Sequence, residues 1–120
     1  MVVGELVDAT LKKYSSTRFG LLSYDEDGTI KQFFSYGLEN CAQWDSDPMP
    51  VFPQGKFPMG LASLRSQWAG YPHVATYVVA GGGHTFLGSD IVFHKTGSMT
   101  MLEWIKKLIH KSEGWGNVVP

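Results

Sequence analysis

Val74-Ala75-Thr76-Tyr77-Val78-Val79-Ala80-Gly81-Gly82-Gly83-His84 is the stretch that decides the fold of this chain. Up to Ala80 it carries no charge and is rich in β-branched and aromatic residues, which is typical of a strand buried in a parallel sheet. The glycines that follow give the backbone conformations that are closed to other residues. Because open α/β sheets place their chemistry beyond the carboxyl ends of the strands, His84 stands where a general base is presented to a cleft.

An earlier segment, Arg18 to Tyr24, has the same design: an apolar strand that runs into a polar turn, Asp25-Glu26-Asp27-Gly28. The chain between the two strands is long enough for a crossover that contains helices, so we expect the strands to run parallel. Asp27 and His84 are then expected at the same edge of the sheet. A carboxylate beside an imidazole sets its tautomer and stabilises its protonated form, as the acid and base of a hydrolytic triad do. Acid before histidine is also the chain order of α/β-hydrolases.

Helices are predicted on either side of these strands. Apolar spacing predicts a short helix ending near Tyr14, a helix over Thr29–Tyr36 that packs through its Phe face, and a helix over Met59–Trp68. The proline-rich stretch from Leu38 to Pro58 is expected to be irregular, and a loop of this length is either functional or a sign that structural context is missing. Ile91 to Phe93 is expected to form a short strand.

The closing helix has the strongest local signals. Thr100-Met101-Leu102-Glu103 has the form of a capping box, which satisfies free amides at a helix start. The apolar stripe of this helix consists of Met101, Leu102, Ile105, Leu108 and Ile109. Cations late in the helix suit its dipole, and Gly114 is expected to end it.

Composition narrows the function classes. The chain has 120 residues and a net charge of −1, which fits a single domain and gives no electrostatic case for nucleic acid. No apolar run approaches the roughly 20 residues of a membrane span, and residues 1–10 lack the basic start of a secretory signal. Cys41 is the sole cysteine, which excludes an internal disulfide and a cysteine-clustered zinc site. The spacing of His73, His84, His94 and His110 matches no standard metal site, so we expect neither metal nor cofactor.

The chain resembles the pectin acetylesterase family. The segment from Arg18 to Asp27, with Gln32-Phe33-Phe34, is similar to the family's acid-bearing segment, and Val74 to Leu87 is similar to its histidine-bearing segment. Met101 to Ile105 resembles its closing helix, and Trp115 to Val118 resembles its tail. The resemblance covers most of this chain but only the C-terminal part of the family.

This resemblance implies an α/β-hydrolase fold and a serine esterase that removes acyl groups from small molecules or polysaccharides such as acetylated pectin. It assigns the acid role to Asp27 and the base role to His84. The helix after Asp27 has one extra residue before its Phe pair, so Asp25 stays a rival for the acid. No Gly-x-Ser-x-Gly nucleophile elbow occurs anywhere in the sequence.

Simpler roles exist for each of these residues. His84 alone is compatible with a structural histidine, and Asp27 with a helix cap. A glycine run such as Gly81–Gly83 also occurs in phosphate-binding loops, but no Lys-Ser/Thr follows it. Trp44, in the proline-rich loop, is the tryptophan that we consider for a substrate rim. Ser63, in the middle of a predicted helix, is a weak candidate nucleophile.

We therefore expect residues 1–120 to form a single partial α/β domain, the C-terminal part of an α/β-hydrolase-like fold with two or three parallel strands flanked by helices. Its function is to supply the acid and histidine of a Ser-His-Asp triad, and alone it is expected to be inactive, to self-associate or to need a complementing fragment. The alternative is a non-catalytic, homo-oligomeric binding module with a hydrolase-like half-fold. The resemblance leans toward an extracytoplasmic parent protein, whereas this chain shows no export signal, so the compartment stays open.

Overall fold

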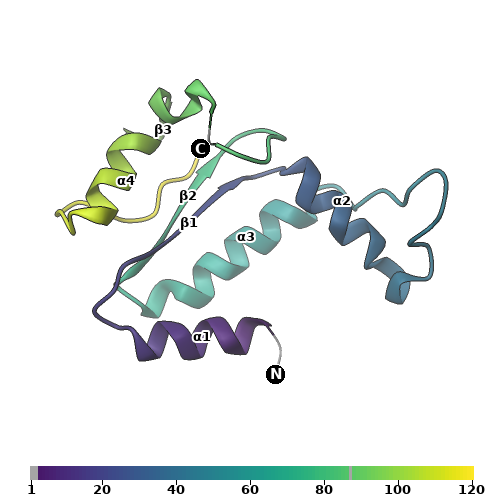
Figure 1. Cartoon of the computed structure of the whole chain (residues 1–120), viewed down its shortest axis with the longest axis horizontal. Helices are drawn as coiled ribbons and strands as arrows, with labels where there is room; N and C mark the ends of the chain where they lie inside the picture. Colours follow the sequence, from purple (N-terminus) through teal and green to yellow (C-terminus); the bar gives the residue numbers. More distant parts are fainter. Residues whose placement is uncertain (1–2, 87) are drawn as a thin grey trace.

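The computed structural model describes residues 3–86 and 88–120 and shows helices packed around a small parallel sheet (Figure 1). The main elements, in chain order, are α1 (Val3–Lys13), β1 (Phe19–Tyr24), α2 (Gly28–Tyr36), α3 (Lys56–Gln67), β2 (Val74–Val79) and α4 (Met101–Ile109). Shorter elements connect them: the 3-10 helices η1 (Leu38–Cys41), η2 (Trp68–Gly70) and η3 (Asp90–Phe93), and the hairpin strands β3 (Lys95–Thr96) and β4 (Met99–Thr100). Met1, Val2 and Leu87, which belong to segments singled out above, lie outside the described residues.

The two main strands run parallel, as the sequence predicts. β1 and β2 pair along their whole length, from Phe19 opposite Val74 to Tyr24 opposite Val79, and the connection between them contains α2 and α3. The C-terminal tail extends the sheet on the far side of β2, where Val118 forms a parallel bridge with Tyr77. The order across the sheet is therefore β1, β2, tail.

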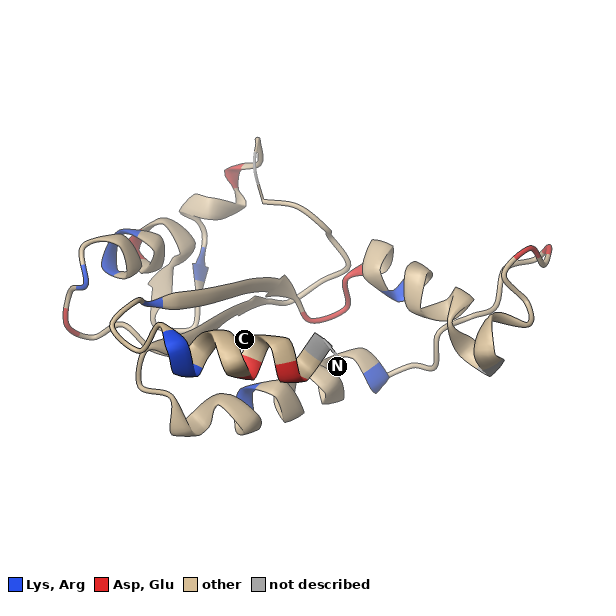
Figure 2. Cartoon of the chain, turned by 60° about the horizontal axis from the view of Figure 1, so that its bottom comes forward, with Lys and Arg blue, Asp and Glu red and all other residues tan. Residues whose placement is uncertain are grey.

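Helices cover both faces of the strands, which confirms the predicted layering. α4 lies on one side of β1 and β2, and α1 and α3 lie on the other (Figures 1 and 2). Figure 2 also shows acidic and basic residues distributed over several elements, in keeping with the net charge of −1. The architecture is thus a mixed helix–strand domain with a small parallel sheet.

The core is centred on the α4 side of the sheet. Trp104, Tyr77 and Met101 are fully buried, and the rings of Tyr77 and Trp104 meet edge to face at 5.8 Å. The indole Nε1 of Trp104 donates to the carbonyl oxygen of Gly116 at 2.6 Å, which satisfies the one polar atom that this side chain brings into the core. Sequence reasoning placed α4 correctly but misjudged its stripe, because Trp104 is central whereas Ile109 is 68% exposed.

The capping box of α4 is present in full. The Thr100 side-chain oxygen accepts from the Glu103 N–H at 3.2 Å, and the Glu103 carboxylate accepts from the Thr100 N–H at 2.7 Å. The backbone N–H of Thr100, followed by its hydroxyl, lowers the pKa of the Glu103 carboxyl below its ordinary value of 4.5. The local sequence therefore sets where this helix begins.

Some expectations about secondary structure were wrong. Ile91 to Phe93 forms part of the 3-10 helix η3 and not a strand, because the Ser89 hydroxyl caps the turn by accepting from the Ile91 N–H at 3.2 Å. The helix predicted from Met59 begins at Lys56. Pro58 lies in the first turn of this helix, where backbone N–H groups have no partner within the helix, so a proline is tolerated there.

The Phe face of α2 is not buried as expected. Phe33 is 65% exposed and Phe34 is 52% exposed. The Phe34 ring lies 5.8 Å from the ring of Phe52 and 6.2 Å from that of Phe57, so these rings form a partly open apolar cluster between α2 and α3. Helical periodicity located the helix, but it did not reveal that little packs against its apolar side.

The molecule exposes more surface than a compact protein of the same mass. Its accessible surface is 7962 Å², whereas a compact monomer of 13.3 kDa exposes about 6,450 Å². The radius of gyration is 16.0 Å against about 13.6 Å for a compact domain of this length. Within the described residues, no helix has the length and apolar character needed to cross a membrane.

Candidate functional site

The turns after β1 and β2 meet at one edge of the sheet and are tied together by backbone hydrogen bonds. The N–H of Glu26 donates to the carbonyl of Gly81 at 3.1 Å, and the N–H of Gly28 donates to that of Gly82 at 3.1 Å. Asp27 lies within the first turn, and His84 follows the second one. The parallel register therefore brings together two residues that are 57 positions apart in the sequence.

Glycine is required in the second turn for two reasons. Gly81 has a φ of +126°, a conformation that L side chains rarely adopt. A Cβ atom on Gly83 would lie 2.5 Å from the ring of Tyr24. The glycine run thus lets the chain pass over Tyr24, whose ring stacks on Phe86 at 4.7 Å, and deliver His84 to the edge.

Asp27 is the buried member of the pair and has two partners. Only 4% of the residue is exposed. Its Oδ1 accepts from the backbone N–H of Ile30 at 2.8 Å, which makes it the N-cap of α2. Its Oδ1 and Oδ2 atoms also lie 3.1 and 3.0 Å from the Nδ1 atom of His84. The capping role and the contact with histidine therefore coexist on one carboxylate.

His84 presents its other ring nitrogen away from this contact. A carboxylate only accepts hydrogen bonds, so the Nδ1 atom facing Asp27 is assigned as the N–H donor and Nε2 holds the lone pair. Nε2 has no hydrogen-bond partner among the described residues, and 43% of the His84 side chain is exposed. This arrangement leaves a basic nitrogen available to a group that approaches from solvent.

His84 and Asp27 line a large apolar groove. The groove has a volume of about 880 Å³ and lies between β1, α2 and α3. Its walls include Leu21, Phe34 and Phe57, and few polar groups interrupt them. A concave, mostly apolar surface with convergent polar groups is the usual form of a binding site.

Asp25, the rival acid, has a different role in the structure. Its Oδ1 accepts from the backbone N–H of Gly81 at 2.8 Å, so it braces the glycine turn. It lines a separate cavity of about 210 Å³ and not the groove. The carboxylate that contacts His84 is therefore that of Asp27. Since the Gly81 amide is used in this way, the turn lacks the open ring of donors that a phosphate-binding loop presents.

None of the remaining candidates has a hydrogen bond to Asp27 or His84 within the described residues. Trp44 is 67% exposed and does not line the groove, so its assignment to a substrate rim stays a prediction without a contact. Ser63 lines the groove from the middle of α3. His73 is held by the carbonyl of Leu11 at 3.0 Å, and the described residues contain no group of three or more potential metal ligands.

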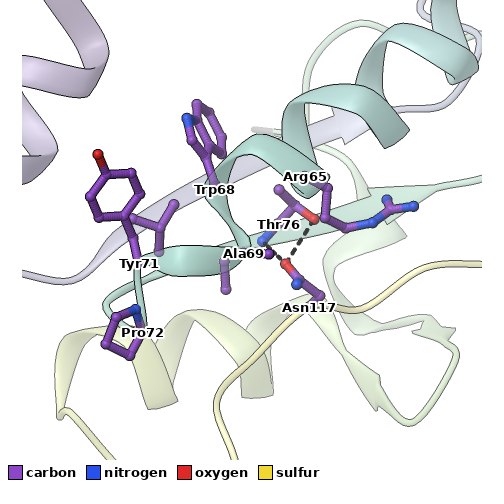
Figure 3. Close-up of a pocket in the computed structure, with 9 residues that line it drawn as sticks. Arg65, Trp68, Ala69, Tyr71, Pro72, Thr76 and Asn117 are labelled. Atoms are coloured by element: carbon purple, nitrogen blue, oxygen red, sulfur yellow. Dashed lines mark hydrogen bonds between the residues drawn. The ribbon is translucent and has the colours of Figure 1, made fainter.

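A further cavity, of about 200 Å³, lies at the other end of β2 and is drawn in Figure 3. There the Asn117 side-chain oxygen accepts from the N–H of Thr76 at 2.8 Å and from its hydroxyl at 3.1 Å. These bonds hold the C-terminal tail against β2. Arg65 is the one charged residue that lines this cavity, and no carboxylate or imidazole lines it. We therefore attribute the cavity to the way the tail packs against β2.

Sequence reasoning missed the groove itself. Its walls come from Leu21, Phe34 and Phe57, which lie in three separate elements, and no local pattern links them. The signal available in the sequence was the Phe pair of α2, of which Phe34 lines the groove. Comparison with protein-family models, curated proteins and solved structures finds no match for this chain.

Proposed function

We propose that this chain supplies the acid and the base of a Ser-His-Asp-type esterase site, as its resemblance to pectin acetylesterases implies. Asp27 is the acid, His84 is the base, and the hydroxyl nucleophile comes from a polypeptide outside this chain. The reaction is the hydrolysis of a carboxylic ester on an acylated small molecule or polysaccharide.

The proposed chemistry follows from the orientation of the imidazole. Nε2 of His84 takes the proton of the nucleophile as its oxygen attacks the ester carbonyl, and then gives it to the departing alkoxide. A water molecule, deprotonated by the same nitrogen, then attacks the acyl carbon, and the imidazolium gives this proton back to the nucleophile's oxygen as the bond to it breaks and the carboxylic acid is released. Asp27 stays ionised throughout, holds Nδ1–H in place and stabilises the imidazolium.

The observation that carries the proposal is the contact of both Asp27 oxygens with His84 Nδ1 at 3.1 and 3.0 Å. Here the carboxylate is buried on one side of the ring and the opposite nitrogen is open. The adjoining apolar groove supports the proposal, because an acyl chain requires an apolar surface.

The serines of the groove do not fit the role of nucleophile. The Ser23 hydroxyl donates to the carbonyl oxygen of Tyr24 at 2.9 Å, so its proton is directed away from His84. Ser63 lies on a regular helical turn, without the strained strand-to-helix turn that exposes a nucleophile. The nucleophile and the oxyanion hole are therefore assigned to an external polypeptide.

A chimera tests this function directly. The C-terminal segment of a pectin acetylesterase is replaced by this chain, and hydrolysis of p-nitrophenyl acetate is measured. We expect esterase activity that falls by about 10⁴-fold in Asp27→Asn and by about 10⁶-fold in His84→Ala. Asp25→Asn is the matched control, since its amide oxygen still accepts from Gly81. A folded chimera whose activity does not depend on His84 refutes the proposal.

A second candidate function, a non-catalytic binding module, is favoured by the open groove and the large exposed surface. It requires neither Asp27 nor His84 for ligand or partner binding. The chimera separates the two candidates, because a binding module has no reason to support ester hydrolysis through His84.

A further inference from the structure

The outer edge of β1 is unpaired in the described part of the chain. The sheet continues beyond β2 through the tail, but β1 has β2 as its sole neighbour among residues 3–86 and 88–120. The backbone N–H groups of Phe19 and Asp25 donate to the carbonyls of His73, just before β2, and of Val79, at its end. Because successive residues of a strand point their polar groups to alternate sides, Gly20, Leu22 and Tyr24 direct theirs to the open edge.

The groove lies along this same edge. Leu21, Leu22 and Ser23, three consecutive residues of β1, line it. Gly20, the first residue with outward polar groups, is itself exposed. Unpaired edges of this kind are where proteins add strands from other chains.

We propose that a second copy of this chain pairs with the outer edge of β1, antiparallel to it, about a two-fold axis beside Leu22. The two copies then form one continuous sheet in the order β2, β1, partner β1, partner β2. This inference goes beyond the proposed esterase role and does not depend on it, because no catalytic group takes part in the pairing.

The outward residues of β1 are self-complementary in this register. Leu22 lies opposite the partner's Leu22, and Gly20 lies opposite the partner's Tyr24. Tyr24, the bulkiest of these three residues, thus lies opposite Gly20, which has no side chain. On that face, Trp104 lies 2.6 Å from the position that a Cβ atom of Gly20 would take. The pairing forms about six backbone hydrogen bonds across the new boundary.

The surface area fits a stable dimer. The chain exposes about 1,500 Å² more than a compact monomer of its mass. If a partner covers this excess on each copy, the interface buries about 3,000 Å² in total, within the range of obligate homodimers.

Cysteine cross-linking tests the register. In a Cys41→Ser background, Leu22→Cys is expected to form a disulfide-linked dimer under mild oxidation, because paired Cα atoms there lie about 5.5 Å apart. Leu21→Cys alone is the matched control and should not cross-link. A mixture of Leu21→Cys and Ser23→Cys chains should do so, since these positions are opposite each other. Equal cross-linking at all positions, or none at position 22, overturns the proposal.

Measurements on the unmodified chain keep the test independent of these substitutions. Light scattering should give twice the 13.3 kDa mass of one chain, and His84→Ala should leave this mass unchanged. In hydrogen exchange, the amides of Gly20, Leu22 and Tyr24 should exchange at least about tenfold more slowly at high protein concentration than on dilution. The Leu21 amide, which is hydrogen-bonded to β2, should be protected from exchange at both protein concentrations. A chain that stays monomeric up to millimolar concentration refutes self-pairing, and the edge is then available to a different polypeptide.

Discussion

The Nδ1 atom of His84 lies 3.0 Å from the Oδ2 atom of Asp27, and this contact joins the turns that follow two parallel strands. The carboxylate is buried and caps the start of α2, so its position is fixed before any ligand binds. The imidazole is half open. The pair therefore has a rigid acidic side and an accessible basic side, the asymmetry that general-base catalysis requires.

The tautomer of His84 gives a first prediction. Nitrogen-15 spectra of the chain should show Nδ1 protonated and Nε2 as the free base, because the Asp27 carboxylate can only accept. In Asp27→Asn the amide can donate to Nδ1, so the proton should move to Nε2. Asp25→Asn should leave the tautomer as in the native chain. The same tautomer in all three proteins would show that Asp27 does not orient the ring.

Stability separates the two functions of Asp27. Asp27→Ala removes the N-cap of α2 and should lower the free energy of unfolding by about 0.5–2 kcal/mol. Asp27→Asn keeps an oxygen for the Ile30 amide and should lose much less. Urea denaturation of both variants measures the difference. Equal losses in the two variants would mean that the charge, and not the cap, stabilises this turn.

Gly20 should not tolerate a methyl group. A Cβ atom there would lie 2.6 Å from the Cη2 atom of Trp104, a fully buried ring with no room to shift. Gly20→Ala should therefore destabilise the chain by about 1–3 kcal/mol. Gly60→Ala is the control, because its Cβ meets nothing within 4 Å and alanine favours a helix by about 0.5–1 kcal/mol. Thermal unfolding of both variants gives the comparison, and a neutral Gly20→Ala would contradict the packing described here.

The capping box makes stability depend on pH. The pKa of Glu103 is lowered by the Thr100 hydrogen bonds, so its stabilising effect is fully present above the ordinary value of 4.5 and is lost as the pH falls through the lower, folded-state pKa. The native chain should exceed Glu103→Gln in stability at neutral pH, and the gap should narrow in acid. Denaturation at several pH values checks this, with Glu5→Gln as a control outside the box. A gap independent of pH would count against the ionised capping box.

The chain by itself should hydrolyse p-nitrophenyl acetate at a rate close to background, because acyl transfer lacks its nucleophile. His84→Ala should be indistinguishable from the native chain in this assay, and a fluorophosphonate probe should label neither. Clear turnover that disappears in His84→Ala would reveal a nucleophile within this chain. Ser63→Ala would then be the next variant to measure.

Local patterns determined much of this protein. The apolar run before Gly81 and the one before Asp25 were sufficient to predict two parallel strands, since the connection between them is long enough for a crossover that contains helices. The capping box placed the start of α4. Parallel strands end at one edge, so the approach of Asp27 to His84 also followed from chain order.

Other features depended on contacts that no window of sequence contains. The choice of Asp27 over Asp25 was decided by where the Gly81 amide points, since that amide already holds Asp25. The apolar groove and the open edge of β1 depend on which surfaces find a partner across the whole fold. Helix hydrogen bonds, helix caps and the alternation of side chains along a strand are local, so sequence can predict them. The direction of a side chain and the filling of space between elements are settled by packing among residues far apart in the chain, so tertiary structure alone decides them.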